Sequence, residues 1–177
     1  IRSIDWRVTA RTNKPHTKIF REERERPTLI VIDQTQNMFF GSKLRLKSVA
    51  VADIAARIAW QTLAAGDRVG GLVVGNEEAR LHKPYRTTKA VARLLNDIAN
   101  LNQALNKNTH RALSHDEMML RIRRLARSNY RIFVLSDFSG SVDSWTDHLQ
   151  KLAKHNSVTA VHIYDPIELQ LLSLIHI

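Results

Sequence analysis

Three oxygen-bearing side chains stand at alternate positions directly after an apolar run. The run from Thr28 to Ile32 is followed by Asp33, Thr35 and Asn37. Alternate residues of a loop can point the same way, so a carboxylate, a hydroxyl and an amide oxygen can meet at one point. Oxygen ligands of this kind suit Mg²⁺ or Mn²⁺ better than zinc. The segment therefore predicts a divalent-cation site.

Two more oxygen donors follow later in the chain. Asp137 comes after another apolar run. Ligands of an open α/β sheet bind outside the carboxyl ends of its strands, so Asp33 and Asp137 are expected on one rim. Thr87 stands at the head of a predicted helix, where its hydroxyl can be a metal ligand or equally the cap of that helix. The predicted metal ligands are Asp33, Thr35, Asn37, Thr87 and Asp137.

Alternating strands and helices would position these side chains. Apolar, β-branched runs predict strands at residues 28–32, 68–74, 131–135 and 158–164. Helical periodicity and capping signals predict helices at residues 43–65, 88–101, 144–155 and from 114 onward. Such alternation implies a Rossmann-like α/β fold, with a mostly parallel central sheet and helices on both faces.

Composition and charge narrow the function classes. The 177 residues suit one domain, and the absence of cysteine excludes disulfides, cysteine-ligated zinc and thiol nucleophiles. The net charge is +10, and nearly all of the excess lies in two stretches, residues 1–27 and 107–131. This predicts a basic surface that attracts an acidic protein or another anionic partner. Nucleic acid is disfavoured because no aromatic-interleaved basic motif accompanies the charge.

Sequence motifs of common enzyme classes are missing. The chain has no Gly-x-Ser-x-Gly elbow, no phosphate-binding Gly-x-x-x-x-Gly-Lys and no Gly-x-Gly-x-x-Gly, and its eight histidines are scattered. We therefore expect a protein that is not an enzyme. No run of about 18 apolar residues is present, so we expect no transmembrane segment in this chain.

The order of the oxygen donors resembles a known metal site. Asp33, Thr35 and Asn37, then Thr87, then Asp137 resemble the metal-ion-dependent adhesion site of von Willebrand factor type A domains, whose pattern is Asp-x-Ser-x-Ser, then Thr, then Asp. The chain as a whole resembles the bacterial "domain of unknown function 58" family, which carries a degenerate form of that domain. The matching stretches are residues 4–6, 9–11, 18–23, 32–38, 66–70, 135–138 and 165–168.

This resemblance implies a function and a division of the chain. It implies a von Willebrand factor type A-like domain at residues 28–168, preceded by an extended segment at 1–27 that belongs to a longer protein. Residues 169–177 are expected to be a truncated or non-native tail. The implied function is protein–protein interaction beside a MoxR-type AAA+ ATPase, in the assembly or activation of protein complexes. The coordination shell of a bound Mg²⁺ or Mn²⁺ would be completed by an Asp or Glu of the partner protein.

Two points stay open at this stage. Thr35 and Asn37 replace the two serines of the adhesion pattern, so the site is degenerate. The alternative function is a metal-independent structural domain, or a basic surface that binds nucleic acid or an anionic partner. The expected location is the cytoplasm, and tethering to a membrane through other parts of a longer protein is left open.

Overall fold

A central sheet of five strands organises the protein. The computed structural model describes residues 6–12, 14–16, 26–105, 115–140 and 142–168 of the chain. The strands are β1 (Thr28–Asp33), β2 (Val69–Val74), β3 (Ala79–Tyr85), β4 (Arg131–Ser136) and β5 (Ser157–His162). Their order in the sheet is β3-β2-β1-β4-β5. All pairings are parallel except that of β2 with β3. The predicted mostly parallel sheet is confirmed.

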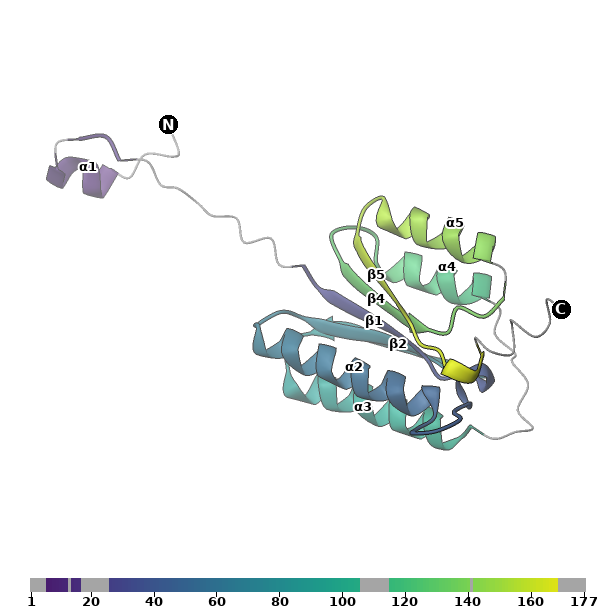
Figure 1. The fold of residues 1–177 in the computed structure, drawn as a ribbon. Coiled ribbons are helices and arrows are strands. Elements are labelled where there is room, and N and C mark those ends of the chain that lie inside the picture. The colour runs from purple at the N-terminus through teal and green to yellow at the C-terminus, as the bar shows by residue number, and fades with distance from the viewer. Residues whose placement is uncertain (1–5, 13, 17–25, 106–114, 141, 169–177) are drawn as a thin grey trace.

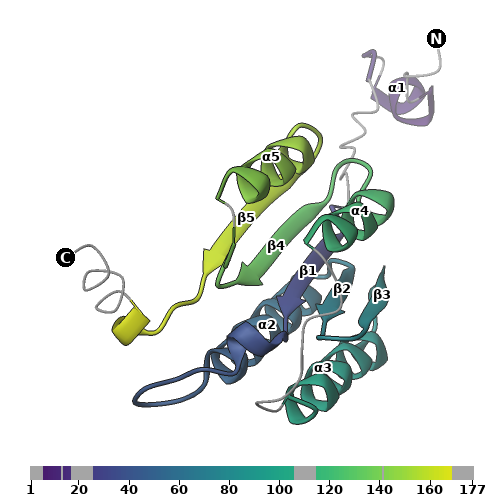
Figure 2. The same ribbon diagram turned by 90° about the vertical axis from the view of Figure 1, so that its right-hand side faces the viewer.

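Two pairs of helices cover the sheet, one pair on each face (Figures 1 and 2). One pair is α2 (Lys47–Ala64) and α3 (Thr88–Gln103), and the other is α4 (His115–Leu125) and α5 (Val142–Ala153). Alternate residues of β1 serve the two cores: Ile30 packs with the α2 and α3 side, and Val31 with the α4 and α5 side. All six residues of β1 are buried, which explains its unbroken apolar run.

The start of α2 differs from the prediction. The helix begins at Lys47, not at residue 43, and residues 41–46 form an irregular loop before it. The Lys47 amide donates to the Phe40 carbonyl across 2.7 Å. A Cβ on Gly41 would lie 2.4 Å from the Arg45 carbonyl oxygen, so this close approach needs glycine. The loop places Lys47 at the carboxyl end of the sheet.

The strand β3 was not predicted. It is an edge strand of alternating partly buried and exposed residues, and it contains Pro84. The β2–β3 register shifts between Val69 and Gly71, and a Cβ on Gly70 would lie 2.6 Å from the His82 carbonyl oxygen, so this close approach needs glycine. At the end of α2, Gly66 adopts a φ of 84°, as expected for a glycine that ends a helix.

The N-terminal segment also departs from expectation. Residues Trp6–Thr12 form a short helix, α1, where an extended segment was predicted. None of its residues is buried, and Trp6 is 62% exposed. The helix start at Ser114 and the tail at 169–177 lie outside the described residues. Within the part of the chain that is described, no helix is long and apolar enough to cross a membrane.

Candidate functional site

The site lies where two neighbouring strands send the chain in opposite directions. β1 and β4 pair in the middle of the sheet. The chain leaves β1 through α2 on one face, whereas it leaves β4 through α5 on the other (Figure 2). Such a switch point opens a crevice at the carboxyl ends of the two strands. We refer to residues 33–37, 47, 136–139 and 168, which lie at this end of the sheet, as the rim.

Asp33 joins the ends of β1 and β4. It is only 3% exposed. Its Oδ1 accepts hydrogen bonds from the amide and the hydroxyl of Thr35, at 3.0 and 2.7 Å. Its Oδ2 accepts one from the hydroxyl of Ser136, at 2.6 Å. Three donors therefore hold this carboxylate in a fixed position, and Ser136, which was not among the predicted ligands, is one of them.

Asn37 and Asp137 meet through a third residue. The Asn37 amide nitrogen donates to the Ser139 hydroxyl across 2.7 Å. The Ser139 backbone amide in turn donates to Asp137 Oδ1 across 3.0 Å. The structure thus gathers four of the predicted residues on one rim, as expected for polar residues that follow neighbouring parallel strands.

Thr87 lies at the other end of the sheet, and its assignment to the site is corrected. β3 runs antiparallel to β2, so that Tyr85 is the partner of Val69, the first residue of β2. Thr87 therefore follows β3 at the amino ends of the parallel strands. Its hydroxyl accepts a hydrogen bond from the Ala90 amide at 3.2 Å, which caps α3. The capping role weighed for Thr87 is the one observed.

A buried lysine completes the rim. Lys47 is 4% exposed, and its Nζ lies 3.0 Å from Asp137 Oδ2 and 2.6 Å from Glu168 Oε1. Burial acts to lower the pKa of Lys47, but the hydrogen bonds to Glu168 and Asp137 and the negative charges of these carboxylates together outweigh it, so the pKa is raised. The ammonium also lies 5.8 Å from the centre of the Phe40 ring. The rim therefore carries a cation of its own.

Glu168 reaches the rim from the segment that follows β5. Its Oε2 accepts a hydrogen bond from the Asp165 amide at 2.8 Å. Asp165 is held by Ser42, whose amide and hydroxyl donate to the carboxylate at 2.7 and 2.5 Å. These two hydrogen bonds and one from the Ile167 amide lower the pKa of Asp165. The segment is thereby fastened to the loop that precedes α2.

The rim borders an open hollow. Its lining includes the aromatic rings of Phe39 and Phe40 beside the charged groups of Lys47, Asp137 and Glu168. Asp137 is 7% exposed at its side chain, whereas the Glu168 side chain is 32% exposed. Charged and aromatic groups are thus presented together at the switch point of the sheet.

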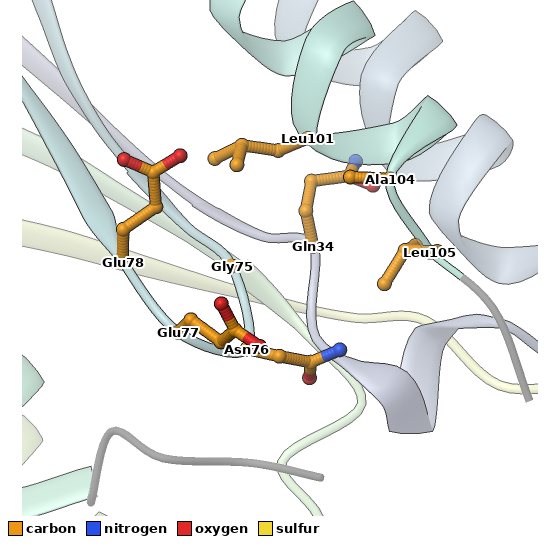
Figure 3. Close-up of a pocket in the computed structure, with 8 residues that line it drawn as sticks. All are labelled: Gln34, Gly75, Asn76, Glu77, Glu78, Leu101, Ala104 and Leu105. Carbon is orange, nitrogen blue, oxygen red and sulfur yellow. The ribbon is translucent and has the colours of Figure 1, made fainter. Parts of the chain in front are cut away.

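A second hollow lies beside the rim, between the β2–β3 turn and the end of α3 (Figure 3). Gln34 and Asn76 line it, and the side chains of both make hydrogen bonds within the protein. Gln34 donates to the Ser48 carbonyl at 3.0 Å and accepts from Asn102 at 2.9 Å. Asn76 accepts from the Gln36 amide at 2.7 Å. These contacts hold the loop after β1 in place and so support the rim.

Comparison with known proteins identifies the family. Residues 1–174 match the family described as "Protein of unknown function DUF58". This chain belongs to the DUF58 family. Curated relatives that are 30% identical over 173 residues include an uncharacterised protein of Mycobacterium bovis and others of Mycobacterium tuberculosis. The match covers 97% of this chain but 53% of each relative, so the DUF58 chain spans about half their length.

Solved structures of low sequence identity share the fold. BatB from Bacteroides thetaiotaomicron has a TM-score of 0.56 at 14% identity, over 76% of this chain and 65% of that one. An aerotolerance-related membrane protein from Bacteroides fragilis has a TM-score of 0.54 at 12% identity, over 77% and 66%. Likeness at this identity shows the fold alone. The predicted α/β fold of the DUF58 chain, with a mostly parallel sheet between two layers of helices, is confirmed.

The rim of this DUF58 protein does not fit a divalent cation as its residues are arranged. Both oxygens of Asp33 accept internal hydrogen bonds. Asp137, the other acidic residue of the predicted set, is paired with the Lys47 ammonium. A positive charge at this distance opposes a second cation on the same carboxylate.

Proposed function

We propose that this DUF58 chain is a non-enzymatic protein-binding domain whose binding surface is the rim. The observation that carries the proposal is the hollow at the switch point, where Phe39 and Phe40 lie beside the paired charges of Lys47 and Glu168. Aromatic side chains are enriched in surfaces that bind proteins. The α/β sheet fixes these groups in place before a partner arrives.

The hydrogen bonding of the rim supports binding rather than catalysis. A nucleophilic hydroxyl needs a neighbouring base that can take its proton, most often histidine. Here the hydroxyls of Thr35 and Ser136 both donate to the buried Asp33 carboxylate, which they hold in place. The Ser139 hydroxyl accepts from the Asn37 amide. These contacts describe a rigid scaffold for the rim.

The proposed partner is a MoxR-type AAA+ ATPase, with which the domain would assemble or activate other protein complexes. This part rests on the family resemblance carried by segments such as residues 32–38 and 135–138. The net charge of +10 would favour encounter with an acidic partner surface. We further propose a cytoplasmic location with tethering to a membrane through other parts of the protein. One structural neighbour is described as a membrane protein, which agrees with this idea.

Binding of Mg²⁺ or Mn²⁺ at Asp33, Thr35, Asn37 and Asp137 stays a prediction. It would require the Lys47 ammonium to leave Asp137, from which it is 3.0 Å away. We therefore propose that the rim binds its protein partner without a metal.

The function is tested with a MoxR-type ATPase from the same genome. Affinity of the purified ATPase for this domain would be measured by calorimetry for the wild type and for Phe40→Ala, which removes a 38%-exposed ring beside the hollow. A matched control is Tyr85→Ala, which removes a 57%-exposed ring at the opposite end of the sheet. We expect Phe40→Ala to weaken binding about tenfold and Tyr85→Ala to leave it unchanged. Equal effects, or no binding by the wild type, would contradict the proposal.

A basic hollow favours a second candidate function. It is lined by Arg123, Arg127, Lys151, Lys154 and His155, among other residues. These residues lie in the last turns of α4 and α5 or directly after them. The hollow therefore lies at the amino ends of β4 and β5, away from the rim. This surface would bind an anionic partner independently of metal. Binding of duplex DNA that falls steeply with salt and is lost in Arg123→Ala/Arg127→Ala would favour this candidate.

A further inference from the structure

We propose that Lys47 supplies the cation of the rim and that Glu168 occupies the place of a partner's carboxylate, so that the site is closed by the chain's own segment after β5. An acidic side chain of a partner protein would displace Glu168 and pair with Lys47. This deepens the proposed function and rests on it. The contacts that carry it are those of the Lys47 ammonium with Asp137 and Glu168, at 3.0 and 2.6 Å.

The burial of Lys47 needs both carboxylates. A lysine that is 4% exposed loses most of its hydration, which is costly unless the charge is paired. Lys47 is also the first residue of α2, where the helix dipole disfavours a positive charge. Two carboxylates offset both costs. If the Glu168 side chain leaves the site, binding of another carboxylate to Lys47 is therefore favourable.

The two carboxylates are held differently. Asp137 directly follows β4, is 7% exposed at its side chain, and has its Oδ1 fixed by the Ser139 amide. Glu168 is 32% exposed at its side chain and lies on a longer side chain beside the open hollow. Asp137 is thus the fixed member of the pair, and Glu168 is the member that can be exchanged.

Exchange would leave the surrounding structure in place. The segment of Glu168 is fastened by Asp165, which accepts hydrogen bonds from Ser42 and Ile167. Rotation of the Glu168 side chain into solvent breaks its bonds to Lys47 and to the Asp165 amide and leaves those of the Asp165 carboxylate intact. An incoming carboxylate would restore the contact with Lys47. Phe39 and Phe40 beside it would receive aliphatic neighbours of the acidic residue.

The test uses a short peptide, acetyl-Ala-Leu-Glu-Leu-Ala-amide, and the same peptide with Gln in place of Glu. Affinities would be measured by NMR titration of the full chain. Glu168→Gln, which keeps the side-chain shape but removes the competing charge, is expected to bind the Glu peptide about tenfold more tightly than the wild type. The Gln peptide should bind both proteins equally weakly. Glu78→Gln, which changes another paired glutamate outside the rim, is the matched control and should behave as the wild type.

A second variant links the effect to the lysine. Lys47→Met added to Glu168→Gln should abolish the gain, and Lys47→Arg added to Glu168→Gln should keep most of it if both double variants are folded by circular dichroism. Equal binding of the Glu peptide by wild type and Glu168→Gln would overturn the inference. So would a gain that persists without Lys47. If Phe40→Ala weakens ATPase binding while Glu168→Gln changes no affinity, the proposed function stands and this inference alone fails.

Discussion

The two ends of the parallel strands hold their polar side chains in different ways. At the carboxyl end, side chains from four separate parts of the sequence meet, and Asp33, Lys47, Asp137 and Glu168 are engaged with one another or with close neighbours. At the amino end, Thr87 caps the helix that it begins, and the basic residues around Arg127 line an open hollow. The rim therefore differs from the amino end because its side chains come from distant parts of the sequence and contact one another. The amino end has a local helix cap and solvated charges.

Strand direction produces this difference. Parallel neighbours such as β1 and β4 end at the same edge, so the residues that follow them meet there. The antiparallel β3 ends at the opposite edge and carries Thr87 away. A motif that is correct in chain order can thus be divided between two ends of the sheet by a single antiparallel strand.

The largest expected effect is that of Asp33→Ala. It leaves the Thr35 amide and hydroxyl and the Ser136 hydroxyl without their buried acceptor, so we expect a loss of about 4 kcal/mol in the free energy of unfolding. Thr87→Ala, which removes one helix cap at the other end, should cost about 1 kcal/mol. Urea unfolding of both variants measures the difference. Similar losses would show that the two ends are equivalent and would contradict the comparison.

A smaller effect is expected from Lys47→Met. Removing the ammonium leaves the buried Asp137 carboxylate unpaired, at a cost of about 3 kcal/mol at neutral pH. Because the pKa of Lys47 is raised in the folded protein, its stabilisation is fully present below the ordinary lysine value of 10.5 and is lost as pH rises through the folded value. The wild type should therefore lose stability above that pH more steeply than Lys47→Met. Parallel curves in pH-dependent urea unfolding would count against a buried, paired lysine.

Much of the fold could be predicted from the sequence because its signals are local. The apolar run of β1, the periodic face of α3 and the glycine at the end of α2 each depend on nearby residues. β3 lacked such a signal, since Lys83 and Pro84 interrupt the pattern of an edge strand that is only partly buried.

The candidate site could be predicted only in part, for the same reason. Asp33 and Asp137 follow apolar strands, so their common rim was foreseeable. The pairing of Lys47 with Glu168 joins residues 121 positions apart, and neither stands in a motif that indicates a charge partner. The place of Lys47 at the rim was also not predictable from the expected helix. A helix that starts at residue 43 would have placed Lys47 inside it and not at its first position.

The most direct test of whether Lys47 is the cation of the rim is a calorimetric titration with Mn²⁺. The purified wild-type domain and an Asp137→Asn variant would both be titrated. With the ammonium 3.0 Å from Asp137, the wild type should show no saturable binding that depends on Asp137. Saturable Mn²⁺ binding that disappears in Asp137→Asn would contradict the account, because it would show that a metal ion, and not Lys47, supplies the charge at this rim.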